Sequence, residues 1–272
     1  ILRWFTIPKA RFLPLTKKLQ SITNKTAPVA ALAAVILIWF ICCNFEIVPA
    51  YMLPSPADVA KAFSVNFAIM MKQAVYTLQE AVYGLGIGII LAFFAAALMD
   101  RFSFVHKAVY PVLIITQTIP TIAIAPLLVL WMGFGMAPKI TLVVITTFFP
   151  VAIGLLDGFK SADNDEINML RSMGAGRLQI FRHIKLPSAA GSFFSGLKIS
   201  ASYAVVGAVI SEWLGGFNGL GVYMTRVKKA YAFDKMFAVI VFISVISLLL
   251  MAFIGVLQKA VMPWERKNRK GN

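Results

Sequence analysis

The sequence predicts an all-α integral membrane protein with about six transmembrane helices, and three observations support this fold class. Hydrophobic residues make up 60% of the 272 residues, whereas charged residues make up only 14%. A soluble domain is about 45–50% apolar and about 25% charged. The charged residues are also clustered, which leaves uncharged runs of roughly 18 residues or more, and such runs are long enough to cross a bilayer as helices.

Charged residues mark the limits of the first two spans. The run TAPVAALAAVILIWFICCNF, residues 26–45, lies between Lys25 and Glu46 and forms the first span. The second span covers about residues 74–99 and is interrupted only by Glu80. Gly84 and Gly88 lie four residues apart in it. Such a small-residue face lets two helices approach closely, so it is a candidate contact with a second copy of the chain.

Prolines interrupt the third span. No charged residue occurs between Lys107 and Lys139, but prolines occupy positions 111, 120, 126 and 138. Proline lacks an N–H donor and disfavours helical backbone in the residue before it. We therefore expect one long, bent helix with a re-entrant break at QTIPTIAIAP, residues 117–126.

Three further spans, at about residues 140–156, 188–213 and 236–258, bring the count to six, so both termini lie on one side. Eighteen Lys and Arg residues fall on the side of the termini, and seven fall on the other side. The positive-inside rule therefore places both termini in the cytoplasm of a multi-pass protein of the cell membrane. The domain organisation is then a cytoplasmic segment (1–26), a transmembrane domain (27–258, including a cytoplasmic loop at 157–187) and a basic tail (259–272).

The net charge of +15 indicates contact with anionic lipid headgroups and not with nucleic acid, because Lys and Arg collect in cytoplasmic segments of membrane proteins. The chain has two histidines and few acidic residues within the spans. We therefore expect no catalytic residue, no metal site and no cofactor bound by this chain, which disfavours a membrane-bound enzyme.

A polar segment, RSMGAGRLQIFRHIKLP at residues 171–187, separates the fourth span from the fifth. The pattern predicts that this segment begins with the end of one short helix, whose start is capped by Asp163, and continues with a turn at Gly174. A second helix then starts near Gly176, and Pro187 opens the next span.

In the second helix, Leu178, Phe181 and Ile184 follow one another at helical spacing, which forms an apolar ridge flanked by basic residues. Three interpretations fit such a segment: a solvated loop, a DNA-binding helix–turn–helix, and a docking element for a soluble partner. The DNA-binding interpretation is excluded because lipid-spanning segments tether the loop on both sides. The residues alone leave the other two open.

The spacing in this loop resembles the cytoplasmic "EAA" loop of permease subunits of binding-protein-dependent ABC importers. That loop has Glu-Ala-Ala, three residues, Gly, nine residues and then Ile-x-Leu-Pro. Here nine residues separate Gly174 from the run 184–187, IKLP, while Asn168, Met169 and Leu170 stand where Glu-Ala-Ala would. The resemblance implies a type I ABC importer permease fold, in which this loop supplies a coupling helix for the ATPase. The coupling residues implied are Gly174, Ala175, Leu178, Phe181, Arg182, Ile184 and Pro187.

Longer stretches are similar to the branch of this family that imports nitrate, sulfonates, taurine and thiamine precursors. These stretches include TLQEAVYGLGIG, GLKISASYAVVGAVISEWLGG and NGLGVYM. QTIPTIAIAPL and SEWLGGFNGLGVYM are most similar to permeases for hydroxymethylpyrimidine-type thiamine precursors. The resemblance therefore implies import of a thiamine pyrimidine precursor, with a sulfonate, taurine, nitrate or a riboflavin-like solute as alternatives.

The partners implied are an ATPase dimer that carries ATP and Mg²⁺, a second permease copy, an extracytoplasmic substrate-binding protein and membrane lipid. The chain lacks the phosphate-binding pattern G-x-x-x-x-G-K-[ST], so a separate polypeptide must hydrolyse the ATP. The alternative of another class is a stand-alone secondary transporter that uses Glu80 or Glu212 as a proton relay.

Polar residues within the spans are costly to bury and are therefore candidates for the solute pathway. Together they offer a heteroaromatic solute amide, carboxylate and aromatic partners. A structural role is the alternative for each: Glu80 as a partner of Lys72, and Glu212 at the turn of residues 215–216. The pathway candidates are Tyr76, Glu80, Gln117, Tyr203 and Glu212.

Overall fold

The computed structural model describes residues 13–45, 47–49 and 51–263, with side chains described from residue 27 onward. This part of the chain confirms the all-α fold. Five helical spans among the described residues are long and apolar enough to cross a membrane, and the number is six if one sharply bent pair of helices is counted as a span. The main helices of the five spans are α1 (Leu13–Asn44), α2 (Pro56–Arg101), α5 (Met136–Lys160), α8 (Leu186–Gly215) and α10 (Phe233–Val261).

Helix α2 is much longer than the predicted second span. Its 46 residues correspond to about 69 Å of helix, whereas the hydrocarbon core of a bilayer is about 30 Å thick. The helix begins beyond Ser55, whose hydroxyl accepts a hydrogen bond from the Asp58 N–H at 3.2 Å. The first turns of α2 carry charged residues. The predicted span was defined by its lack of charge, so it matched the apolar second half of the helix and missed the start.

The predicted break in the third span is confirmed. Helix α3 (Ser103–Thr118) and helix α4 (Thr121–Met132) meet at an angle of 101°. Ile119, which precedes Pro120, has the extended backbone (φ −82°, ψ 122°) that a following proline favours. The chain therefore turns sharply at residues 119–120, within the expected segment.

Helices α2, α5 and α8 pack closely through small residues. A Cβ atom added to Gly84 would collide with Val143 of α5, and one added to Gly88 would collide with Thr147. These two glycines therefore serve packing within one chain, and their predicted role as a contact between two copies is wrong. The same crowding occurs where α5 crosses α8, since a Cβ on Gly158 would lie 2.5 Å from the Cα of Ala189.

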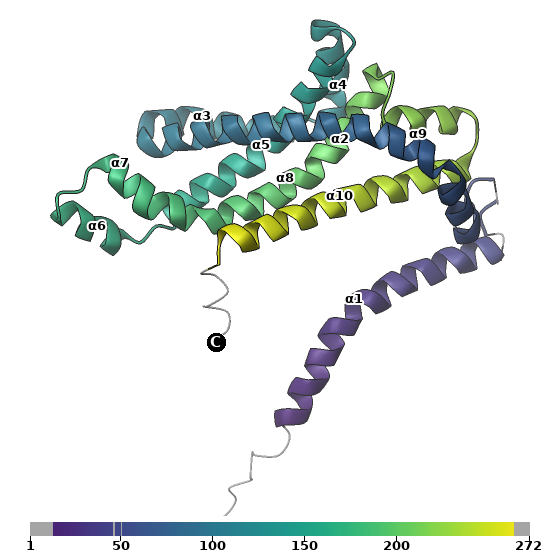
Figure 1. The fold of residues 1–272 in the computed structure, drawn as a ribbon, viewed down its shortest axis with the longest axis horizontal. Coiled ribbons are helices and arrows are strands. Elements are labelled where there is room, and N and C mark those ends of the chain that lie inside the picture. Colours follow the sequence, from purple (N-terminus) through teal and green to yellow (C-terminus); the bar gives the residue numbers. More distant parts are fainter. Residues whose placement is uncertain (1–12, 46, 50, 264–272) are drawn as a thin grey trace, which may run out of the picture.

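Helix α1 runs apart from the rest of the bundle (Figure 1). Residues 27–44 of this helix have no buried side chain. Near its end, the Trp39 indole N–H donates a hydrogen bond to the Pro54 carbonyl at 3.1 Å, and the Trp39 ring lies 5.9 Å from that of Phe237. Contact between α1 and the bundle is therefore made close to the loop that joins α1 to α2.

The short helices lie at opposite ends of the molecule (Figure 1). At one end are α6 (Asn164–Ser172), α7 (Arg177–Ile180) and the single π-helical turn η1 (Phe181–Lys185). At the other end are α4 and α9 (Leu220–Lys229). The predicted limits of the transmembrane domain fall inside helices, because α1 begins before residue 27 and α10 runs beyond residue 258.

Candidate functional site

The turn at Gly174 has the geometry that the sequence predicted. Gly174 has φ +85°, in the left-handed region that glycine adopts without strain. Its N–H donates to the Arg171 carbonyl at 2.9 Å, and the Ala175 N–H donates to the Leu170 carbonyl at 2.9 Å. This pair of bonds is the Schellman arrangement that closes a helix C-terminus. At the other end of α6, the Asp163 carboxylate caps the helix by accepting from the Asp165 N–H at 2.8 Å.

Pro187 lies in the first turn of α8, as predicted, but the helical backbone starts earlier, because α7, η1 and α8 follow one another without a break from Arg177. The Leu186 N–H donates to the Phe181 carbonyl, five residues earlier, which makes η1 a π-helical turn. A proline inside a helix cannot donate to the carbonyl four residues before it and crowds that carbonyl. The π-helical turn lies directly before Pro187. It contains the carbonyl group that the proline ring would crowd in a regular α-helix.

The apolar ridge predicted for this segment is wrong in its orientation. Ile184 is buried, and Phe181 is partly buried with its ring 5.2 Å from that of Phe159 in α5. Ile184 also joins a small core with Ile167 and Ile180, against which Ala175 packs. Three of the predicted coupling residues, Ala175, Phe181 and Ile184, therefore face the permease itself, because the inward stripe runs through Ile180, Phe181 and Ile184.

The outward apolar surface is made by Leu178, which belongs to the predicted ridge, and by Met169 and Met173, which were not predicted. Leu178 is 78% exposed, Met173 is 77% exposed and Met169 is 58% exposed. Large apolar side chains with this exposure, on a polar segment, are typical of a surface that a partner covers. We call these three residues the docking surface. Among the other predicted coupling residues, Arg182 and Pro187 are also exposed.

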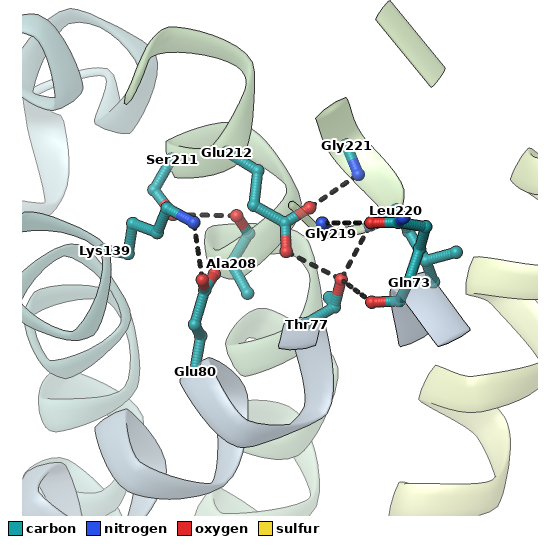
Figure 2. Close-up of polar contacts among 10 residues, drawn as sticks. All are labelled: Gln73, Thr77, Glu80, Lys139, Ala208, Ser211, Glu212, Gly219, Leu220 and Gly221. Atoms are coloured by element: carbon teal, nitrogen blue, oxygen red, sulfur yellow. Dashed lines mark hydrogen bonds and ion pairs between the residues drawn. The ribbon is translucent and has the colours of Figure 1, made fainter. Parts of the chain in front are cut away.

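A second polar site lies at the opposite end of the bundle and is shown in Figure 2. The Lys139 ammonium of α5 forms an ion pair with Glu80 Oε1 of α2 at 2.6 Å. The two side chains are 7% and 3% exposed, so both charges are buried. Glu80 Oε2 is buried and has no hydrogen-bond partner in the described part of the chain. The pair therefore depends on a single short contact.

Glu212 of α8 fastens the loop between α8 and α9. Its carboxylate accepts from the Thr77 hydroxyl at 2.7 Å and from the Gly221 N–H at 2.6 Å (Figure 2). Thr77 Oγ1 also accepts from the Leu220 N–H at 2.9 Å. Gly219 has φ +121°, and a Cβ there would collide with the Glu212 carboxylate. The site therefore requires glycine at 219, and it ties the loop to helix α2.

The structure separates the five predicted pathway residues. Glu80 and Glu212 lie in the buried polar cluster, and the partner of Glu80 is Lys139, not Lys72. Gln117 and Tyr203 line a cavity of about 1470 Å³ between α5, α8 and α10, and Tyr76 lies apart on α2.

This cavity contains a charged residue that the sequence analysis did not select. The Lys198 ammonium lies on the cavity wall and donates to Gln258 Oε1 at 2.6 Å. Asp157, Ser192 and Ser195 also line the cavity, which extends to the end of the bundle where α10 finishes. Lys198 is the only lysine within the predicted span 188–213, whose other charged residue is Glu212, and this was the available signal, since charge within a membrane marks pathways.

Comparisons with known proteins identify related chains. Residues 84–264 match the model of the family described as binding-protein-dependent transport system inner membrane component. The formylaminopyrimidine transport permease protein ThiX of Halalkalibacterium halodurans is 35% identical over 80% of this chain and 87% of its own. The riboflavin transport system permease protein RibX of Chloroflexus aurantiacus is 28% identical over 96% of this chain and 98% of its own.

Other relatives carry names for aliphatic sulfonate, taurine and nitrate transport. Among solved structures, a chain of an amino acid ABC transporter matches 72% of this chain and 96% of its own. The TM-score is 0.60 at 15% identity. That likeness shows a shared fold.

Proposed function

Because this chain belongs to the family of binding-protein-dependent transport system inner membrane components, we propose that it passes a thiamine pyrimidine precursor across the cell membrane. It is a permease subunit of an ABC importer, from the branch whose relatives are named for nitrate, sulfonates and taurine. A separate ATPase hydrolyses the ATP, and a substrate-binding protein delivers the solute.

The proposed mechanism starts at the docking surface. An ATPase dimer, holding ATP and Mg²⁺, receives Leu178, Met173 and Met169 of each permease copy. Closure of the ATPases draws the docked segments together, and the continuous helix from α7 to α8 carries the movement into the membrane. The Gly174 turn sets the angle between α6 and that helix. Both termini and the docking surface lie in the cytoplasm in this proposal, as the charge distribution favours.

We infer that two copies of the chain form the pathway, since a dimeric ATPase offers two equivalent docking positions. Gly84 and Gly88 are occupied by α5 and are not available for this contact. Exposed apolar side chains elsewhere on the bundle, such as Trp131 at 71% and Phe94 at 61%, contact membrane lipid or the second copy.

The proposal of a thiamine pyrimidine precursor as the solute rests on one observation. A relative named for formylaminopyrimidine transport is 35% identical over 80% of this chain. The cavity chemistry agrees with it. Gln117 offers an amide, Tyr203 an aromatic ring, and Ser192 and Ser195 hydroxyl groups. An aminopyrimidine stacks on aromatic rings and both donates and accepts hydrogen bonds. The alternatives are a sulfonate, taurine, nitrate or riboflavin, after which other relatives are named.

The test is transport by the complete importer in proteoliposomes. We expect a formylaminopyrimidine to raise ATP hydrolysis and to be taken up only when ATP is supplied. Taurine, nitrate and riboflavin serve as matched solutes. Stimulation by one of these alone would contradict the proposed solute, whereas uptake that continues without ATP would favour a stand-alone secondary transporter.

Tyr203→Ala tests the cavity as part of the pathway. An aromatic contact is worth roughly 0.5–1.5 kcal/mol, so we expect the substitution to weaken the solute interaction about two- to tenfold. The measurement is the KM for uptake by the complete importer. Tyr83→Ala is the control, since Tyr83 is 54% exposed on α2 and does not line the cavity. Equal effects of the two substitutions would remove Tyr203 from the pathway.

A further inference from the structure

A second cavity, of about 710 Å³, lies between the end of α2 and the segment that contains α7 and η1. Its lining includes four basic residues, Arg101, Arg171, Arg177 and Lys185, and one acidic residue, Asp100. The formal charge around the cavity is therefore +3. This site is separate from the solute cavity and from the buried cluster at the other end of the bundle.

Among the described residues, Asp100 is the one carboxylate that lines this cavity, and it already has a partner. The Lys185 ammonium donates to both Asp100 oxygens, at 2.7 Å and 2.8 Å. None of the acidic residues in the described ranges forms an ion pair with Arg101, Arg171 or Arg177. Arg101, Arg171 and Arg177 therefore line one cavity, and none of them has an anionic partner among the described residues. Guanidinium groups bind phosphate through paired N–H donors, which makes a phosphate group the best-fitting anion.

The surroundings of the cavity indicate that this phosphate belongs to a lipid. Arg101 ends the apolar helix α2, so its charge lies where that span leaves the hydrocarbon. Next to it, Phe102 is 48% exposed and Phe104 is 83% exposed, and the Arg101 guanidinium lies 5.1 Å from the centre of the Phe102 ring. Basic pockets at the cytoplasmic ends of spans bind anionic headgroups, while exposed apolar side chains contact acyl chains.

We propose that this cavity binds the phosphate headgroup of an anionic phospholipid, with Arg101, Arg171 and Arg177 as its ligands. Arg171 and Arg177 flank the Gly174 turn, and Arg101 belongs to the membrane helix. The headgroup therefore bridges the bundle and the docking surface. Assignment to the cytoplasmic leaflet rests on the proposed orientation, whereas lipid binding itself does not.

The experiment measures binding of short-chain phosphatidylglycerol to the detergent-purified complex of permease and ATPase, by native mass spectrometry. Each basic residue near a membrane surface contributes about 1 kcal/mol, or about fivefold in affinity. The double substitution Arg101→Gln/Arg177→Gln should therefore weaken binding by about 25-fold. Phosphatidylcholine of the same chain length and inorganic phosphate are the matched probes.

Lys228→Gln/Lys229→Gln removes two exposed charges from α9, at the other end of the molecule, and should leave binding unchanged. Arg101→Lys/Arg177→Lys keeps the charge but removes the paired guanidinium donors, so it should bind more tightly than the Gln variant and more weakly than the unchanged protein. Equal binding of phosphatidylglycerol and phosphatidylcholine would overturn the proposal, as would equal losses in the two Gln double variants. Full competition by inorganic phosphate would assign the site to a free anion. If the Arg101→Gln/Arg177→Gln protein lost the ATPase but still bound lipid, the cavity would be assigned to a protein contact.

Discussion

Replacement of Lys139 by methionine is expected to lower the free energy of unfolding by about 3–5 kcal/mol, because it leaves the buried Glu80 carboxylate without its ion-pair partner. The second Glu80 oxygen has no hydrogen bond to compensate among the described residues. Glu212 adds another carboxylate to the same cluster (Figure 2). Thermal unfolding of the purified permease, and the amount recovered from the membrane, measure the effect.

The matched control is the double substitution Glu80→Leu/Lys139→Met. Replacing both members of a buried ion pair by apolar residues of similar size is often nearly neutral, so the double variant should recover most of the lost stability. Lys61→Met supplies the same change at an exposed position of α2 and should have little effect. A Lys139→Met protein as stable as the Lys61→Met protein would contradict the role of the pair.

Leu178→Asp is expected to weaken ATPase binding by about 30-fold or more, while the permease itself stays folded. Leu178 is 78% exposed, so the isolated permease loses little burial when the side chain changes. In the proposed complex, by contrast, the substitution would place an unpaired charge at the centre of the apolar contact with the ATPase. Central interface residues contribute about 2 kcal/mol or more. The measurement is the affinity of the ATPase for permease in nanodiscs, paired with thermal unfolding of the permease.

Phe181→Ala is the matched comparison. Phe181 packs against Phe159 inside the permease, so its truncation should lower stability by roughly 3 kcal/mol and affect ATPase binding less than Leu178→Asp does. The reverse result, with binding lost at Phe181 and retained at Leu178, would place the ATPase contact at Phe181 and contradict the docking surface.

Features set by local chemistry could be predicted from the sequence. Uncharged runs located the spans, Pro120 located the break between α3 and α4, and Gly174 located the turn before α7. In each case a residue type dictates the backbone around it, whatever the rest of the chain does. The family spacing from Gly174 to Pro187 depends on the same local rules.

Features set by packing could not be predicted in this way. Leu178, Ile180, Phe181 and Ile184 are all apolar, so two stripes on the helix look alike in sequence, and only contact with Phe159 shows which stripe faces inward. Lys72 is near Glu80 in sequence, but the ion-pair partner of Glu80 is Lys139. Lys139 reaches Glu80 because α2 and α5 pack together where Gly84 meets Val143. Such pairings depend on how helices cross, which periodicity does not encode.

We expect the ATPase to bind the permease at the docking surface around Leu178. The most direct test places a photo-crosslinking amino acid at position 178, and separately at position 181, in the complete importer within a membrane. We expect position 178 to crosslink to the ATPase and position 181 to crosslink within the permease. Crosslinking of position 178 to lipid alone, with the ATPase bound in the complex, would contradict the account.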